Sequence, residues 1–586
     1  EMGQVLTIQR SLRNVEEHDA SHIPTTSTQV DSVTHSGAGP TPGPTAAAPA
    51  VSTQQASPMV APALGPEYDP ESGEETIKSC VRRQDLEGVR RHVEERGADP
   101  NTKDENNISL LHWAALGKDA STIMYLLERG ADPNARNMRE ETPLHWAAQV
   151  DLGVVHVLVV RGADARAVDN KGYSPMHHAA QKNQPLVMDY LHAKGLPVDV
   201  VDNDGRTPLH WAAYMDHPVV VQWLLSHGAD ITAQDREQCM PLHWAALKGS
   251  AKAANELVVY GTQVSRQLEA RDMTNSTAAE LAAEKVEKAT DRRIARGASR
   301  TRHLITRRQN LLRVLKPLGL DRYIPPHHYF MFWVLALVVM PAGMWTYYTY
   351  MLEYTAHRTE LTMVFYLSYL LQWAFWAHAG FADPGTLAGG PAGRRRHPRY
   401  DELHQAYEAD LMNGRSDNLC PSTRIKKPER SKYDAVSRRC IERFDHFCPW
   451  MNNAVGRNNY RSFFGFLVTA FVTATAFNIL YYDYVFAVGP SRTSAFFNYL
   501  AFPGMSLFVL HFMFYSLFAF LLIIQHGHLI SRNLTTNEAI NWQKYPYLTD
   551  RYGRYVNKYD RGVWNNWLEF LGLGMQDEPR GGHFAV

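Results

Sequence analysis

Three reactive side chains stand within four consecutive residues in the second half of the chain. Asp445, His446 and Cys448 are interrupted only by Phe447, and Pro449 follows the cysteine. A free thiol, with a pKa of about 8.5, is only a few per cent thiolate at neutral pH, so a nucleophilic cysteine needs a base beside it. His446 can take the thiol proton, and Asp445 can orient the imidazole and stabilise its charged form. The pattern predicts nucleophilic catalysis at Cys448, in a tight turn that brings the three side chains together.

Long apolar stretches flank this segment. Each offers about the 20 residues that a helix needs to cross a bilayer. They lie at 329–352, 361–380, 463–488 and 505–529. The segment between the second and third stretches, 381–461, holds fifteen Lys or Arg, whereas the other two connections hold one each. The positive-inside rule therefore predicts four spans with 381–461 and both chain ends in the cytosol. A nucleophile held against a bilayer in this way favours an acyl thioester as its substrate.

A seven-residue motif recurs five times in the first half of the chain. Its first copy is Ser-Leu-Leu-His-Trp-Ala-Ala at 109–115, and later copies begin Thr-Pro-Leu-His or a close variant. The histidine returns at steps of 33 or 32 residues, at His112, His145, His177, His210 and His243. This period and core sequence are typical of ankyrin repeats, each a turn and two helices that stack into a solenoid. We expect the repeated histidines to be structural.

Four of the five copies carry tryptophan directly after the histidine, at Trp113, Trp146, Trp211 and Trp244. Two interpretations are open. The tryptophans either replace a core leucine of the first helix of each repeat, or one or two of them line a groove that binds a partner peptide, where Trp is a favoured anchor.

Composition bounds the remaining possibilities. The chain has 586 residues with 60 Lys and Arg against 60 Asp and Glu, which argues against a nucleic-acid partner. Five scattered cysteines do not make a disulfide framework and indicate a reducing compartment. We expect an all-α protein, an ankyrin solenoid followed by a four-helix polytopic membrane domain with an irregular cytosolic catalytic loop. The expected parts are a disordered tail (1–70), ankyrin repeats (71–285), a basic juxtamembrane linker (286–327), two membrane helices (328–380), the catalytic loop (381–461), two more membrane helices (462–529) and a cytosolic C-terminal region (530–586).

Four motifs in the second half resemble, in the same order, those of the Asp-His-His-Cys (DHHC) protein S-acyltransferases. The ankyrin-plus-membrane arrangement resembles the ankyrin-bearing branch of that family. The motifs are Asp383-Pro384-Gly385 after the second apolar stretch, Asp445-His446-Phe447-Cys448-Pro449-Trp450, Thr535-Thr536-Asn537-Glu538 as the family's T-T-x-E, and a C-terminal stretch that ends near Asn566.

The resemblance implies a protein S-palmitoyltransferase. Cys448 would take a palmitoyl group from palmitoyl-CoA and pass it to cysteine thiols of substrate proteins recruited by the ankyrin repeats. His446 would act as base and then as acid, and Asp445 would orient it. Thr536 would brace the aspartate, and Asn566 would support the local backbone. The resemblance also implies an integral endomembrane protein, most often of the Golgi, with palmitoyl-CoA as co-substrate and the lipid bilayer as its surroundings.

The sequence departs from the family at its zinc ligands. The eight positions fall on Cys420, Thr423, Tyr433 and Cys440 for the first site, and on Asp434, Ser437, Phe447 and Ala454 for the second. Only two cysteines remain, and a structural zinc needs four closed ligands, usually thiolate or imidazole. We therefore predict that both zinc sites are lost and that aromatic packing and the flanking helices hold the loop instead.

Two rival functions are weighed against the transferase. An inactive membrane scaffold would recruit partners through the ankyrin repeats alone, and labelling of Cys448 by palmitoyl-CoA discriminates it. An ankyrin-bearing cation channel would need a pore-lining segment between late spans, and 489–495 is too short to supply one.

Overall fold

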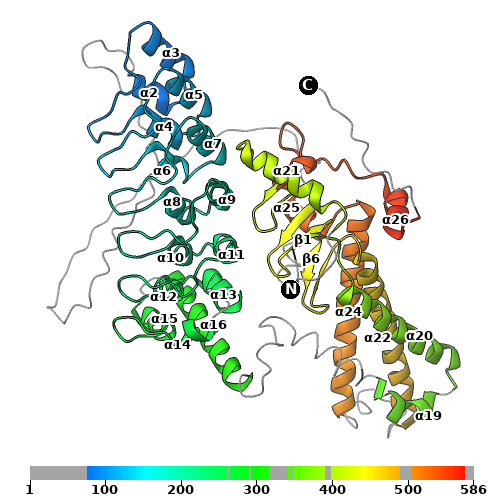
Figure 1. The fold of residues 1–586 in the computed structure, drawn as a ribbon. Coiled ribbons are helices and arrows are strands. Elements are labelled where there is room, and N and C mark those ends of the chain that lie inside the picture. The colour runs from blue at the N-terminus through cyan, green and yellow to red at the C-terminus, as the bar shows by residue number, and fades with distance from the viewer. Residues whose placement is uncertain are drawn as a thin grey trace, which may run out of the picture.

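The computed structural model describes residues 76–260, 264–288, 292–315, 341, 344–345, 347–355, 357–389, 397–488 and 503–573. The predicted tail, 1–70, and most of the first predicted span, 329–352, lie outside these residues. Figure 1 shows a stack of short paired helices and, beside it, a bundle of long helices with small sheets at one end.

Pairs of short antiparallel helices form the N-terminal solenoid, as the repeat period predicts. The first helix of most pairs begins at the proline of the motif, because proline suits the first helical position. The helices are α2 (Ile77–Arg82), α3 (Leu86–Glu94), α4 (Leu110–Leu116), α5 (Ala120–Glu128), α6 (Pro143–Ala147), α7 (Leu152–Val160), α8 (Pro175–Gln181), α9 (Pro185–Ala193), α10 (Pro208–Tyr214), α11 (Pro218–Ser226), α12 (Pro241–Lys248), α13 (Ala251–Tyr260), α14 (Val264–Glu269) and α15 (Ala278–Lys288).

The motif histidine ties each repeat to the next. His112 Nδ1 accepts the Ser109 amide at 3.2 Å, and its Nε2 lies 3.0 Å from the Glu141 carbonyl oxygen of the following repeat. The ring therefore carries its proton on Nε2 and donates it across the repeat boundary. Burial lowers the pKa of the equivalent His145 to about 3, which keeps the neutral form that this bridge needs.

The basic segment expected as a linker is instead, over its first part, a packed helix. Helix α16 (Arg292–Leu315) lies along α12, α13 and α15, with Ala298 and Ile305 fully buried. The close approach needs glycine, because a Cβ on Gly297 would lie 2.6 Å from the carbonyl oxygen of Gly249. Helix α16 thus extends the solenoid beyond the predicted boundary at residue 285.

Three long helices form the bundle: α20 (Thr359–Phe381), α22 (Tyr460–Val488) and α24 (Pro503–Ser531). Their ends fall within three residues of the apolar stretches at 361–380, 463–488 and 505–529. Within the described part of the chain, two helices are apolar and long enough to cross a membrane, over Tyr460–Ala487 and Phe512–Ser531. The two short elements before α20 are η3 (Tyr347–Met351) and α19 (Leu352–Thr355). Four spans therefore stay a prediction.

The segment between α20 and α22 is more regular than expected. It contains α21 (Tyr400–Met412) and three small antiparallel sheets, ordered β1-β5-β4, β2-β3 and β6-β7. Their strands of two to four residues are too short to leave an alternating sequence pattern. The strands are β1 (Thr386–Gly389), β2 (Leu419–Cys420), β3 (Ile425–Lys426), β4 (Ser431–Asp434), β5 (Arg439–Glu442), β6 (His446–Cys448) and β7 (Asn453–Val455). After α24 come α25 (Thr536–Asn541), η4 (Trp542–Lys544), η5 (Pro546–Leu548) and α26 (Val563–Leu571).

The solenoid docks onto this segment through α21 (Figure 1). Tyr407 and Leu411 of α21 are fully buried in the same apolar cluster as the repeat helices. The Tyr407 hydroxyl donates to the carboxylate of Asp189, which is 1% exposed, and Arg424 Nε lies 3.7 Å from the same carboxylate. Close contact also requires Gly414 after α21, since a Cβ there would lie 2.6 Å from His156 Cβ.

Two further contacts extend this interface along the solenoid. The Tyr433 hydroxyl donates to Gln222 Oε1 at 3.0 Å, and Arg438 Nη2 donates to Glu256 Oε2 at 2.9 Å. Asp189, Gln222 and Glu256 come from successive second helices, α9, α11 and α13. The outer face of the solenoid therefore supports the segment that contains the reactive residues.

The variant Asp189→Asn tests this support. The neutral amide leaves Tyr407 with a weaker acceptor and removes one of the two carboxylates that face Arg424, since Glu408 remains paired with it, at a cost of about 1–3 kcal/mol. Since about 1.4 kcal/mol is a tenfold change in an opening equilibrium, amide hydrogen exchange in α21 should be roughly tenfold faster. The exposed Glu284→Gln on α15 is the control and should exchange like the parent. Equal exchange in the two variants would contradict the proposed support.

Candidate active site

Asp445, His446 and Cys448 converge at the β6–β7 hairpin. His446 and Cys448 lie two residues apart in β6, so their side chains share one face of the strand. Strand β7 fixes them from the other side, with His446 opposite Val455 and Cys448 opposite Asn453. The Asp445 amide donates to the Val455 carbonyl at 2.8 Å, which closes the hairpin just before the histidine.

Both oxygens of the Asp445 carboxylate receive hydrogen bonds. His446 Nδ1 donates to Oδ2 at 2.6 Å, and the backbone amide of Thr536, at the start of α25, donates to Oδ1 at 2.6 Å. Asp445 is 2% exposed. Burial alone would raise its pKa, but the contacts with His446 and the Thr536 amide outweigh burial and hold the pKa below its ordinary value. Asp445 is therefore a permanent anion that fixes the imidazole ring.

The same contacts set the charge of His446. Burial opposes the charged ring, yet the hydrogen bonds to Asp445 and to Cys448 prevail and raise the pKa of His446 to about 10. With Nδ1 committed to Asp445, Nε2 is the atom that faces the thiol. The imidazole is thus a strong base toward Cys448 and, once protonated, a stable cation beside it.

Cys448 lies in an apolar cluster built by all three long helices. Its side chain, 5% exposed, is buried with Trp376, Ala379 and Phe463, and more of α20, α22 and α24 packs around it. Trp376 Nε1 donates to the Trp450 carbonyl at 3.2 Å, which anchors the turn after β6 to α20. A hydrocarbon chain carried on this sulfur would have apolar side chains on several sides.

The T-T-x-E residues form the floor of the site. Thr535 and Glu538 make a capping box at the start of α25, which aims the Thr536 amide at Asp445. Glu538, 2% exposed, also pairs with Arg430 through two bonds of 2.7 and 2.8 Å. The role of Thr536 is carried by its main-chain amide, because its hydroxyl has no hydrogen-bond partner among the described residues.

The other predicted supporting residues hold the surrounding backbone. Asp383 accepts from the Thr386 amide and hydroxyl, and the Gly385 carbonyl accepts from the Glu442 amide of β5 at 2.9 Å. The Pro384 carbonyl accepts from the Asn458 amide at 3.4 Å, just before α22.

Asn566 of α26 donates to the Ser531 carbonyl at the end of α24 and to Asp560 Oδ1, both at 2.7 Å. The motif after α20 and the C-terminal motif therefore join the strands to the long helices without touching Cys448.

Two residues that the sequence reasoning did not select are central to this framework. Arg430 reaches Glu538 across 108 positions of the chain, and Asn533 Oδ1 accepts from both Arg430 and Arg443, at 3.1 and 2.6 Å. Beside the ring of His446, Tyr460 OH and His526 Nδ1 lie 2.9 Å apart. Nothing in local spacing points to these partners, because each comes from a distant element.

The positions of the family's zinc ligands gather but do not fit zinc. Cys420 and Cys440 share a small buried apolar cluster with Tyr433 packed on it, and the Tyr433 hydroxyl is used by Gln222. At the second site Phe447 and Ala454 face each other across β6 and β7 in another apolar cluster. Two thiols are short of four ligands, and the second set offers hydrocarbon where a metal needs donors.

The tryptophans of the repeats divide into two kinds. Trp146 and Trp244 are buried, at 3% and 6% exposure, and each donates its Nε1 to a carboxylate, Glu141 and Asp235, at 2.9 Å. Trp113 and Trp211 are half-buried and pack edge-on against the buried pair. A groove role is thus left for Trp113 and Trp211 only.

Comparison with known proteins agrees with these features. Residues 414–543 match the DHHC palmitoyltransferase family, and ankyrin-repeat families match 77–159, 150–235 and 216–255. The chain therefore carries a DHHC palmitoyltransferase domain joined to ankyrin repeats.

Among curated relatives, the chain is 28% identical over 216 residues to Palmitoyltransferase AKR1 of Mortierella alpina, covering 34% of this chain and 37% of that one. It is 27% identical over 249 residues to Palmitoyltransferase Hip14 of Drosophila melanogaster, covering 40% and 37%. It is 32% identical over 196 residues to Palmitoyltransferase ZDHHC18 of Mus musculus, covering 30% and 47%. The matches span less than half the length of each relative. A solved ankyrin domain, that of Bcl-3, aligns with 38% of this chain and 98% of its own at 24% identity and a TM-score of 0.31.

The variant Glu538→Gln tests the floor of the site. Glutamine keeps a cap for the Thr535 amide but leaves the buried Arg430 without its counter-charge, which costs about 3–5 kcal/mol. We expect a clear fall in the thermal unfolding temperature of the purified protein. The control Arg554→Ala breaks an exposed pair with Asp550 and should cost less than about 1 kcal/mol. Equal unfolding temperatures for the two variants would show that the buried Glu538–Arg430 pair contributes little to stability.

Proposed function

We propose that the chain is a protein S-palmitoyltransferase that works through an acyl-Cys448 intermediate. The observation that carries this proposal is the Asp445–His446–Cys448 array, buried where the small sheets meet an apolar helix bundle. The DHHC family match over 414–543 supports the same chemistry. In this proposal Asp445, His446 and Cys448 are the catalytic residues.

Acylation begins with a proton transfer inside the array. An ordinary thiol has a pKa of about 8.5, below the value of about 10 for His446, so the proton passes from Cys448 Sγ to His446 Nε2. The thiolate attacks the thioester carbonyl carbon of palmitoyl-CoA, and the bond from that carbon to the CoA sulfur breaks. His446 returns its proton to the departing CoA thiolate, which leaves palmitoyl-S-Cys448.

Transfer to protein repeats these steps in reverse. A substrate cysteine gives its proton to His446 and attacks the acyl carbonyl, while the Cys448 sulfur leaves and regains the proton. Asp445 stays ionised throughout and stabilises the imidazolium. The apolar cluster around Cys448 suits a long acyl chain, because each buried methylene contributes about 0.8 kcal/mol.

We further propose a multi-pass endomembrane protein, most simply of the Golgi, with four spans and with 381–461, the solenoid and the C-terminal region in the cytosol. The fifteen basic residues of 381–461 support this orientation. The ankyrin repeats recruit substrate proteins, with Trp113 and Trp211 as the accessible groove residues. The zinc sites of the family are lost, and contacts of the solenoid with Tyr407, Tyr433 and Arg438 hold the segment in their place.

Labelling with palmitoyl-CoA tests the activity. Purified protein given radiolabelled palmitoyl-CoA should acquire a thioester label that hydroxylamine removes, and Cys448→Ala should lose it. Cys80→Ala, which removes a buried thiol of the first repeat, should label like the parent. A parent protein that takes no label would establish the alternative, an inactive ankyrin scaffold, and a label that survives Cys448→Ala would refute the assigned nucleophile.

The pH dependence tests the role of Asp445. Because Asp445 raises the pKa of His446 to about 10, the ring of the parent can take up and hold a proton throughout the neutral range. Asp445→Asn removes the anion that raises the pKa of His446, so the rate of single-turnover acylation at pH 7 should fall by about 100- to 10,000-fold. The variant should recover part of its rate with rising pH, because hydroxide in the solvent then removes the thiol proton in place of the ring. A parallel pH profile for parent and variant would contradict this role.

A further inference from the structure

One ankyrin repeat departs from the others at the tryptophan position. The residue after the motif histidine is Trp in four copies of the motif and His178 in the third. A second departure lies in the repeat before it. The residue just ahead of the motif is Ile108, Tyr173, Arg206 or Cys239 in the other copies, and it is acidic only at Glu141.

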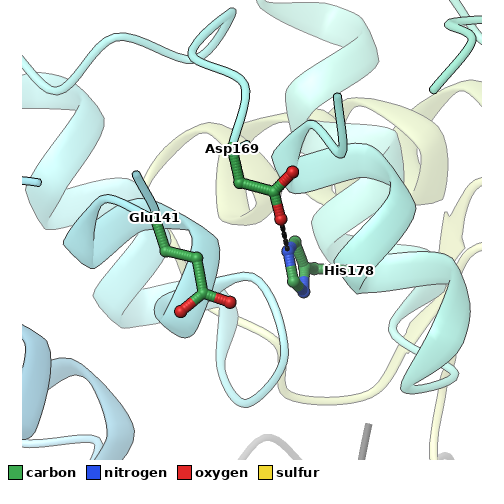
Figure 2. A group of neighbouring side chains, drawn as sticks. All are labelled: Glu141, Asp169 and His178. Atoms are coloured by element: carbon green, nitrogen blue, oxygen red, sulfur yellow. Dashed lines mark ion pairs between the residues drawn. The ribbon is translucent and has the colours of Figure 1, made fainter. Parts of the chain in front are cut away.

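These two departures meet at the same place. In the last copy, Trp244 Nε1 donates to Asp235 Oδ2 at 2.9 Å. His178 and Asp169 are the equivalent pair two repeats earlier, also nine residues apart, but His178 Nε2 is 3.7 Å from Asp169 Oδ2. That separation is too long for a hydrogen bond. Figure 2 shows that Glu141, from the neighbouring repeat, places its carboxylate close to Asp169 and His178.

The cluster is buried, and the one basic side chain that pairs with it among the described residues is His178, through the long contact with Asp169. Glu141, Asp169 and His178 are 7%, 6% and 6% exposed, and one ligand atom of each lies within 4.8 Å of the others. Among the described residues neither carboxylate forms an ion pair with Arg or Lys. His178 Nε2 has no hydrogen-bond partner there, although it is buried and points at Asp169. Two buried carboxylates beside one imidazole leave an excess of negative charge, which is costly in a dry site.

Each side chain keeps one donor atom for a ligand. Asp169 Oδ1 accepts the amides of Lys171 and Tyr173 at 2.9 and 2.8 Å, which leaves Oδ2. Glu141 Oε2 accepts from Asn137 and Trp146 at 2.8 and 2.9 Å, which leaves Oε1. These backbone and side-chain donors orient both carboxylates before any ligand arrives.

The second ring nitrogen of His178, Nδ1, has a hydrogen-bond partner of its own. It lies 3.2 Å from the side-chain amide of Gln149. A ligand on Nε2 requires the proton on Nδ1, and the Gln149 amide accepts that proton once it is turned over to present its oxygen. Gln149 would thus be the outer-shell partner that sets the tautomer.

We propose that Glu141, Asp169 and His178 bind one divalent transition-metal ion of the Zn²⁺ class between the repeats that carry the second and third copies of the motif. One imidazole and two carboxylates match Zn²⁺ and Co²⁺, whereas Mg²⁺ and Ca²⁺ take oxygen ligands throughout. Tetrahedral bonds of about 2.0–2.1 Å place ligand atoms about 3.3 Å apart, so the ring and Asp169 need to close by only a few tenths of an ångström. Glu141 supplies the third protein ligand after a side-chain rotation, and a water molecule takes the fourth position. The proposal is independent of the transferase function.

Co²⁺ is the probe for this site, because four-coordinate Co²⁺ absorbs visible light and replaces Zn²⁺. The full chain, purified in detergent and stripped with a chelator, should develop a visible band that saturates at one Co²⁺ per chain and disappears when Zn²⁺ is added. His178→Trp should abolish the band. This variant installs the residue that the other four copies carry, so its metal-free melting temperature should match the parent. Glu141→Gln, Asp169→Asn and Gln149→Leu should each weaken Co²⁺ binding at least tenfold.

A second variant separates this site from the two thiols of segment 381–461. Cys420→Ser combined with Cys440→Ser should keep the visible band, and the parent should show no near-ultraviolet thiolate-to-cobalt absorption. A parent that shows no saturable band would overturn the proposal and leave the cluster as a plain histidine–carboxylate pair. A band that survives His178→Trp, or that is lost in the double cysteine variant, would also overturn it.

Discussion

A single buried anion organises the reactive centre. The Asp445 carboxylate is taken almost wholly out of water, which on its own would cost several kcal/mol. Two charge-assisted hydrogen bonds offset this cost, one from the ring of the next residue and one from an amide 91 positions further along the chain. The anion is therefore stable only when the β6–β7 hairpin and the start of α25 are in contact. Activation of the thiol and closure of the fold depend on the same carboxylate.

The second requirement is that the amide of Thr536 be aimed correctly. Glu538 does this by capping α25, and its remaining charge is balanced by Arg430 from the turn before β4. Asn533 Oδ1 accepts hydrogen bonds from Arg430 and from Arg443, which lies two residues before Asp445. These charges form one buried network around the hairpin. Removing Arg430 or Glu538 leaves the charge of the other uncompensated, so the cost of either substitution exceeds the worth of a single contact.

The sequence alone could predict the parts of this protein whose signals are local. The repeats follow from a fixed period, and the ends of α20, α22 and α24 follow from uninterrupted apolar runs. Asp445, His446 and Cys448 were found because they are neighbours in the chain. Contacts between distant elements leave no such signal, as with Tyr407 and Asp189, which lie 218 positions apart. The packing of α16 against the last repeats is likewise not evident from its basic sequence. The strands give no sequence signal because each has only two to four residues, too few for an alternating pattern to be recognised.

The interface with the solenoid explains how the segment folds with so few metal ligands. Zinc in small domains contributes roughly 10–16 kcal/mol to folding, so a segment with fewer than four metal ligands needs stabilising contacts from elsewhere. These contacts come from the solenoid, against which segment 381–461 packs apolar side chains. Tyr407 and Leu411 complete the apolar core of the repeats, while Tyr433, at one of the family's ligand positions, and Arg438 contact Gln222 and Glu256. Folding of the segment is thereby coupled to folding of the solenoid, and the repeats act on the nucleophile as a structural support as well as through any partner they bind.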